Sequence, residues 1–209
     1  MKKIMDKLHN QVKINKNLLV FLLVLMLVGI IVGSIFVTIL SKADKELVIT
    51  HLNGFLDTIE TDKIDYLLVL KNNLTTNLLF IGIIWLLGIS VIGLPIMVVM
   101  FFTKSFILGF SIGSILSTFG AKGILFSIFY VFPGQVISIL FILLLMMYSM
   151  SFSFKLIYAI FKKKSIDFKI MINRYSIIFL IVLIGIILMN LYDTYLMPRI
   201  IKSIITMIR

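Results

Sequence analysis

Residues 74–154 contain only two charged side chains, Lys104 and Lys122, in 81 positions. About a quarter of the residues in a soluble domain are charged, so a water-facing fold would not leave so long a stretch this apolar. A helix that crosses a bilayer needs about 20 apolar residues, which makes the stretch long enough for three crossings. The sequence therefore predicts an integral membrane protein, in agreement with its 61% hydrophobic content.

Two further apolar runs complete the predicted spans. The first, residues 18–40, has 23 residues and would be about 35 Å long as a helix. It is too long for a typical signal-peptide core and no small-residue cleavage site follows it, so we interpret it as a retained span. The last, residues 176–197, is expected to stop at Pro198. The prediction is one all-α domain over residues 1–209, a polytopic bundle of about five transmembrane helices.

The charges alternate in sign along the chain. Residues 1–17 carry five lysines against one aspartate (+4), and residues 155–175 carry six basic residues against one aspartate (+5). Residues 41–73 carry six acids against four lysines (−2). Because cytoplasmic loops are enriched in basic residues, we predict a cytoplasmic N-terminal stub, an extracytoplasmic acidic segment and a cytoplasmic basic loop.

Five crossings also place the basic tail, residues 198–209, outside, against the same rule; an even number of crossings would remove this anomaly. The tail has isoleucines on one side and polar residues on the other, which predicts an amphipathic helix in the interface that could pair with the acidic segment. Since the net charge of +11 lies mostly beside apolar spans, we predict contact with membrane lipid and no nucleic-acid binding.

The acidic segment, residues 41–73, is expected to be partly helical. Ser41-x-x-Asp44 is a plausible helix start. Apolar residues then recur at helical spacing at Leu52, Phe55, Leu56 and Ile59. The helix either lies on the protein's own spans or docks an extracytoplasmic partner, and the two roles can coexist. The candidate docking residues are Asp57, Glu60, Asp62 and Asp65.

Small residues mark two predicted spans. The third span has Ser105, Gly109, Gly113 and Ser117 at spacings of four, and the first has Gly29-x-x-x-Gly33. Such stripes let helix backbones approach closely, and association in lipid depends on this packing. We expect packing within one chain; an interface in a homo-oligomer is the alternative.

Polar features inside the predicted spans are few. Pro133-Gly134 predicts a helix break, beside Gln135, because proline removes a backbone donor. Lys104 is expected near the cytoplasmic face, since a lysine deep in hydrocarbon costs about 2.5–3.5 kcal/mol. Gln135, Lys104, Asn77 and Asn190 are few polar groups for a transport pathway. We therefore prefer to interpret the amides as forming hydrogen bonds between helices.

The sequence offers little for catalysis. It has no cysteine, and both histidines, His9 and His51, lie in charged segments. Asp193 stands alone near a span end, and no nucleotide-binding motif is present. We predict no enzymatic activity, no metal and no cofactor.

The order of these features resembles the stage II sporulation protein M family over essentially the whole chain. The resemblance rests on "VGIIVGSIF" in the first span, "KNNLTTNLLFIGIIWLLG", "FTKSFILGFSIG" and "YVFPGQVISILFILLL". Relatives often carry a histidine or acid near the proline of the last motif, where this chain has Gly134-Gln135.

The resemblance implies a non-enzymatic scaffold in engulfment during endospore formation, on the mother-cell side of the septum. Its implied partners are two peptidoglycan-degrading proteins, sporulation proteins D and P. The wider family is also likened to transporter permeases, so a permease-like membrane subunit is the alternative function.

Overall fold

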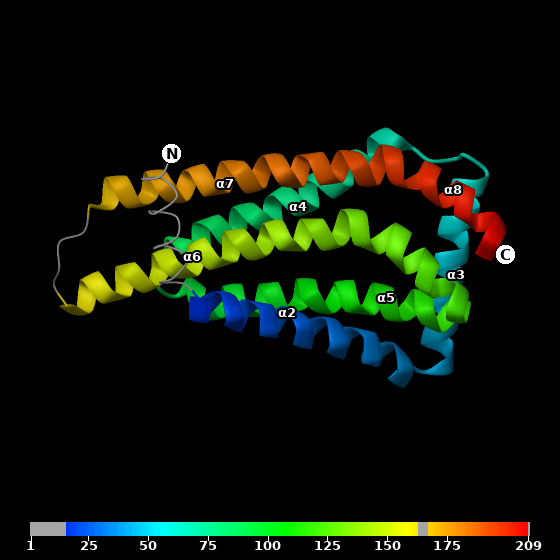
Figure 1. Ribbon diagram of the computed structural model, residues 1–209, viewed down its shortest axis with the longest axis horizontal. Helices are drawn as coiled ribbons and strands as arrows, with labels where there is room; N and C mark the ends of the chain where they lie inside the picture. Colours follow the sequence, from blue (N-terminus) through cyan, green and yellow to red (C-terminus); the bar gives the residue numbers. More distant parts are fainter. Residues whose placement is uncertain (1–15, 163–166, 209) are drawn as a thin grey trace.

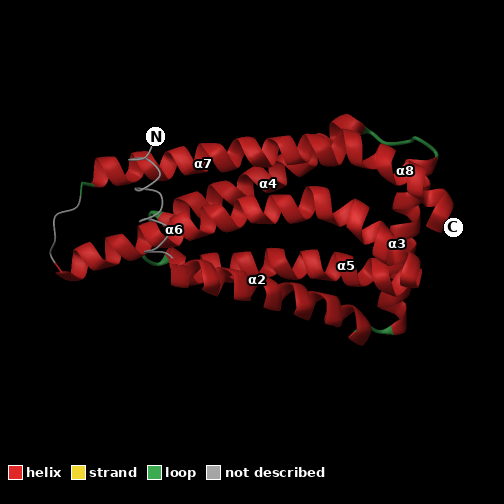
Figure 2. Ribbon diagram, viewed as in Figure 1, coloured by secondary structure: helices red, strands yellow, loops and turns green. Residues whose placement is uncertain are grey.

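The computed structural model describes residues 16–162 and 167–208, which are helical almost throughout (Figure 2). Of the predicted basic segments, most of residues 1–17 and the centre of residues 155–175 lie outside the described residues. The elements are α2 (Lys16–Phe36), η1 (Val37–Ile39), α3 (Lys42–Glu60), α4 (Tyr66–Gly88), α5 (Gly93–Val131), η2 (Phe132–Val136), α6 (Ile137–Lys162), α7 (Phe168–Leu191), η3 (Tyr192–Leu196) and α8 (Met197–Ile208).

Five helical segments are long and apolar enough to cross a membrane, which confirms the predicted all-α bundle. They are Lys16–Ile39, Tyr66–Gly88, Gly93–Ile124, Pro133–Phe161 and Phe168–Ser203. These rods lie alongside one another, while α3 lies across one end of the bundle, next to α8 (Figure 1). We call this the α3 end. Because the number of crossings is odd, α2 begins at the opposite end of the bundle from α8.

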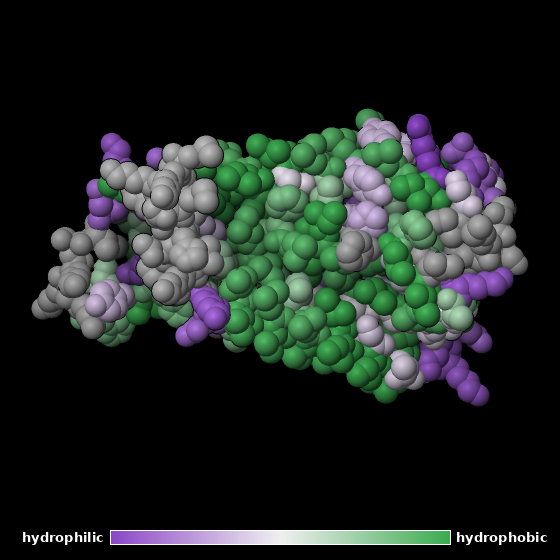
Figure 3. All heavy atoms as spheres, viewed as in Figure 1, coloured by the Kyte–Doolittle hydropathy of each residue, from purple (hydrophilic) through white to green (hydrophobic). Residues whose placement is uncertain are grey.

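The outside of the bundle is apolar along its middle and polar at its ends (Figure 3). Ile31, Leu79 and Ile184 are more than half exposed on three different crossings. A water-soluble protein rarely leaves so large an apolar surface uncovered, whereas hydrocarbon chains solvate it. The chain is thus a multi-pass membrane protein.

The interior is filled by large apolar side chains from different crossings, including Phe101, Ile142, Met146 and Ile186, all fully buried. In a bilayer these contacts stabilise the fold mainly through van der Waals packing, because lipid is as apolar as the core. Close fit between helices therefore matters more here than the amount of apolar area buried.

The chain turns between α4 and α5 at residues 89–92, and it reverses again inside α5 at Gly120. Gly120 has φ 57° and ψ −135°, a conformation that favours glycine. A Cβ at Gly123 would lie 2.7 Å from the Ile115 carbonyl oxygen, so the segment after Gly120 folds back closely on the third crossing.

Pro133-Gly134 does not interrupt the fourth crossing as predicted. Residues 132–136 form a single π turn, and α6 continues directly from it. A π turn inserts one extra residue into the helix and so absorbs the missing proline N–H without ending the rod. The predicted break is a bulge, and the reversal lies at Gly120 instead.

The boundaries of the last crossing also differ from the prediction. α7 already begins at Phe168, so Arg174 of the predicted basic loop is helical. Pro198 does not stop the helix: the π turn η3 precedes it, α8 follows directly, and the crossing continues to Ser203. As at Pro133, the π turn accommodates the missing proline N–H without ending the helix.

Candidate functional site

The predicted acidic segment folds into α3 and the loop that follows it. The Ser41 hydroxyl accepts the Asp44 N–H at 3.2 Å, which caps the helix at the predicted position. Leu56 and Ile59 are 1% exposed, so this face of α3 packs onto the end of the bundle. The opposite face of α3 remains exposed.

All four candidate docking residues lie exposed at the α3 end, although their local settings differ. Asp57 and Glu60 are on α3. Asp62, in the loop, pairs with Lys202 of α8 at 3.8 Å and accepts a hydrogen bond from the Tyr66 hydroxyl at 3.4 Å. Asp65 caps α4 by accepting the Leu68 N–H at 3.0 Å.

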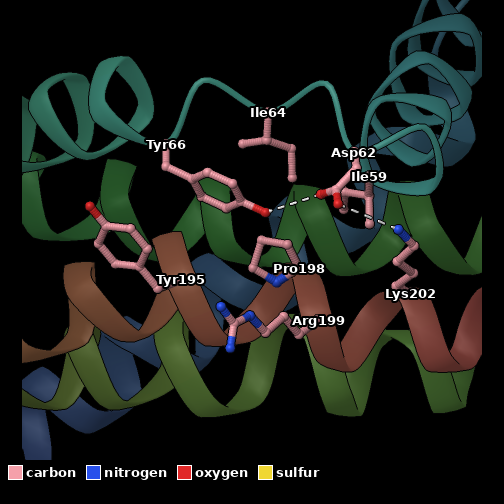
Figure 4. A pocket seen from close by; sticks show the side chains of 8 residues that line it. All are labelled: Ile59, Asp62, Ile64, Tyr66, Tyr195, Pro198, Arg199 and Lys202. Atoms are coloured by element: carbon pink, nitrogen blue, oxygen red, sulfur yellow. Dashed lines mark hydrogen bonds and ion pairs between the residues drawn. The ribbon is translucent and has the colours of Figure 1, made fainter.

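The Asp62–Lys202 pair joins the acidic segment to the tail, the pairing that the charges predicted. Both side chains are at least half exposed, so the pair itself adds little stability. It brings the loop after α3 next to α8. Beside it is a cleft of about 490 Å³ (Figure 4), lined by Ile59, Asp62, Ile64, Tyr66, Tyr195, Pro198, Arg199 and Lys202.

The small residues of the first and third spans meet in one interface between α2 and α5. A Cβ at Gly29 would lie 2.7 Å from the Ser105 Cβ, and one at Gly33 would overlap the Phe106 carbonyl. Backbone approach of this kind is possible only because these side chains are minimal.

The other half of the contact comes from α5. A Cβ at Gly109 would overlap the Ile30 carbonyl, and one at Gly113 would lie 2.7 Å from the Ser34 carbonyl oxygen. Ser117, the last residue of the stripe, is exposed. Within this chain the stripe therefore packs against α2 through Ser105, Gly109 and Gly113.

Three polar residues from three crossings form a partly buried hydrogen-bonded chain. Lys104 Nζ donates to Asn77 Oδ1 at 3.1 Å, and Asn77 Nδ2 donates to Asn190 Oδ1 at 2.9 Å. Asn190 Nδ2 in turn donates to the Ile186 carbonyl at 2.7 Å. The Lys104 ammonium also lies 5.5 Å from the centre of the Phe80 ring, a favourable cation–π geometry.

This placement corrects the prediction for Lys104. Its partner Asn77 is the middle residue of α4, so the ammonium points into the bundle at mid-span, away from either end of the helix. The two amides supply the polar contacts that hydrocarbon lacks. Gln135, the remaining amide of the predicted pathway, lies half-buried in η2 and is not part of this chain.

The two π turns meet at Gly134 and Asp193. A Cβ at Gly134 would overlap the Asp193 carboxylate, so the glycine leaves the space that this side chain occupies. Asp193 Oδ1 is buried and accepts no hydrogen bond from the described residues. Sequence reasoning placed Asp193 alone near a span end and did not pair it with Gly134. The only sequence signals for this contact were a proline next to a glycine in one span and a single acidic residue in another.

The spacing of the remaining ionisable groups determines whether they could hold a metal ion. In the described part of the chain, no three His, Asp or Glu side chains lie close enough to hold a metal ion. His51 is exposed on α3, and His9 lies outside the described residues. What the arrangement offers is a rigid bundle with an acidic surface and a cleft at the α3 end.

Comparison with known proteins gives one match. The family model described as stage II sporulation protein M matches residues 22–198, which run from α2 to the start of α8. Neither the curated proteins nor the solved structures gave a match.

Proposed function

The chain belongs to the stage II sporulation protein M family, and from this premise we propose that it is a non-enzymatic membrane scaffold for engulfment. In this role it recruits and anchors peptidoglycan-degrading partners at the septal membrane. The family match makes it a sporulation-related membrane protein; recruitment is our inference from the α3 end.

The observation that carries the proposal is the exposed acidic face of α3. Burial of Leu56 and Ile59 fixes the helix on the bundle and turns Asp57 and Glu60 outward. Charged groups at a docking surface steer encounter and select partners more than they add affinity. A fixed acidic surface therefore suits recognition of a basic surface on a soluble domain.

We propose that the α3 end faces the extracytoplasmic space and that the N-terminus is cytoplasmic. Lys16, Lys169 and Arg174 lie at the opposite end of the bundle, where the positive-inside rule expects cytoplasmic residues. On the mother-cell side of the septum, this orientation presents α3 to the peptidoglycan. The proposed partners are sporulation proteins D and P, as the family resemblance implies.

The test is co-purification of the full chain from sporulating cells, with the double variant Asp57→Asn/Glu60→Gln. Both substitutions preserve side-chain shape and remove the charges. We expect the variant to accumulate in the membrane and to recover several-fold less wall hydrolase. The matched control is Glu46→Gln, which removes an exposed carboxylate nearer the start of α3. Equal recovery by the double variant and the control would contradict docking through this face.

The alternative function, a permease-like membrane subunit, is favoured by one observation, the partly buried chain of Lys104, Asn77 and Asn190. A carrier places such groups at mid-membrane to meet its substrate. Here each of the three groups makes a hydrogen bond within the protein, as expected for a packing contact. Solute or ion flux into liposomes that Lys104→Met or Gln135→Ala abolishes would favour transport, as would co-purification of an ATPase without a hydrolase.

A further inference from the structure

The cleft at the α3 end carries an excess of positive charge. Its ionisable lining consists of Arg199 and Lys202 against the single carboxylate of Asp62. Lys202 is already paired with Asp62, as the dashed lines of Figure 4 show. The Arg199 guanidinium has no hydrogen bond or ion pair to the residues that the structure describes. An exposed arginine fork is therefore available beside the cleft.

The cleft also lies at the border between the apolar band and the polar end. Tyr66, at the start of α4, and Tyr195, in η3, form one wall with their rings stacked 5.7 Å apart. Tyrosines concentrate at this level because the ring is apolar and the hydroxyl is polar. Arg199 follows Tyr195 by one helical turn and so lies at the level of lipid head groups.

Below the tyrosines, on the bundle side, the surface is apolar and open. Leu188, on α7 before Tyr195, is 57% exposed, and Leu67, on α4 after Tyr66, is 77% exposed. A phospholipid whose head group entered the cleft would lay its acyl chains along such a surface. A head group alone fits a volume of about 490 Å³.

We propose that this cleft binds the phosphate of a phospholipid of net negative charge, with Arg199 as the principal ligand. The planar guanidinium offers two parallel N–H donors to phosphate oxygens, a geometry that lysine cannot reproduce. Lys202 adds a second cation at the rim. A zwitterionic lipid carries the same phosphate, but its ammonium group would have to compete with Lys202 for Asp62, the one carboxylate of the cleft lining, so the site prefers the anionic lipid.

The experiment uses the absence of cysteine from the chain. A single-cysteine variant, Leu67→Cys, is labelled with a fluorophore and the full-length protein is reconstituted in phosphatidylcholine vesicles. A minor fraction of the lipid carries brominated acyl chains, which quench on contact, either on phosphatidylglycerol or on phosphatidylcholine. We expect phosphatidylglycerol to be enriched at the label by about fivefold, the effect of one basic residue near a membrane surface.

Arg199→Gln should reduce this enrichment to near unity, and Arg199→Lys should retain only part of it. The control, Arg174→Gln, removes an exposed arginine at the other end of the same crossing and should change nothing. Equal quenching by the two brominated lipids would refute the proposal, as would enrichment that survives Arg199→Gln. If that variant does not fold, the Arg199→Lys measurement decides: full enrichment with lysine would refute the proposal, and partial loss would support it.

One further outcome separates this site from the docking face. The Arg199→Gln variant could leave lipid enrichment intact but reduce hydrolase recovery. That result would assign the cleft to an acidic group of a protein partner and overturn the lipid proposal. Because the vesicles contain no partner, failure of the lipid measurement leaves the scaffold function standing.

Discussion

The Ser34 hydroxyl of α2 donates a 2.8 Å hydrogen bond to the Gly109 carbonyl oxygen of α5. This bond can form because glycine at 109 lets the α2 backbone approach until the Ile30 carbonyl occupies the place of a Cβ. A polar group of one crossing thus reaches the main chain of another. The contact joins two elements 75 residues apart in sequence and is the basis of the first prediction.

Gly109→Ala should destabilise the bundle by about 1–3 kcal/mol, because an added methyl group must push α2 away from α5. Gly109→Leu should prevent accumulation of the folded protein. The measurement is thermal unfolding of the detergent-solubilised protein, with membrane accumulation for the leucine variant. The control is Gly82→Ala in α4, where an added Cβ has no neighbour within 4 Å. Normal accumulation and function of Gly109→Leu would contradict the packing role.

Asn77→Ala should destabilise the bundle by about 1–3 kcal/mol, because it removes the hydrogen-bond partner of the Lys104 ammonium and of the Asn190 side-chain oxygen. A double-mutant cycle with Asn190→Ala should give a coupling energy of about 0.6–1.7 kcal/mol, the range for hydrogen bonds between membrane helices. Unfolding in detergent measures both quantities. Asn72→Ala, at an exposed position of the same helix, should have little effect. Additive energies in the cycle would show that the chain is not coupled.

Gly134→Ala should destabilise the protein, because its methyl group and the Asp193 carboxylate cannot occupy the same space. Adding Asp193→Ala should restore most of the lost stability by emptying that space. Adding Asp193→Asn should not, because asparagine has nearly the same volume. The midpoint of thermal unfolding compares the three variants. Equal melting of Gly134→Ala/Asp193→Asn and Gly134→Ala/Asp193→Ala would argue against direct contact between the two π turns.

Local patterns predicted much of this fold. The apolar runs gave the number and class of crossings, and Ser41-x-x-Asp44 marked the start of α3 because capping depends only on neighbouring residues. Gly29, Gly33 and the stripe from Ser105 were each recognisable as packing surfaces. The sequence did not indicate that these two surfaces pack against each other, since a helix face of small residues can pack against any similar face.

What sequence reasoning missed depends on partners distant in the chain. Lys104 was assigned to a membrane face because its insertion cost was judged for a lysine without a partner. Asn77 lowers that cost, from a position 27 residues away. Pro198 was expected to end a helix, but a π turn precedes it and the helix continues into α8. Neither the Asn77 contact of Lys104 nor the π turn before Pro198 can be recognised from neighbouring residues in the sequence.

The pairing of Asp62 with Lys202 has a consequence for biogenesis. During synthesis the aspartate leaves the ribosome 140 residues before the lysine that holds its loop. The α3 end therefore reaches its final form only after the fifth crossing has been inserted. A chain truncated before α8 would lack both the helix against which α3 packs and the ion-pair partner of Asp62. The acidic surface of α3 is thus complete only once α8 is in place.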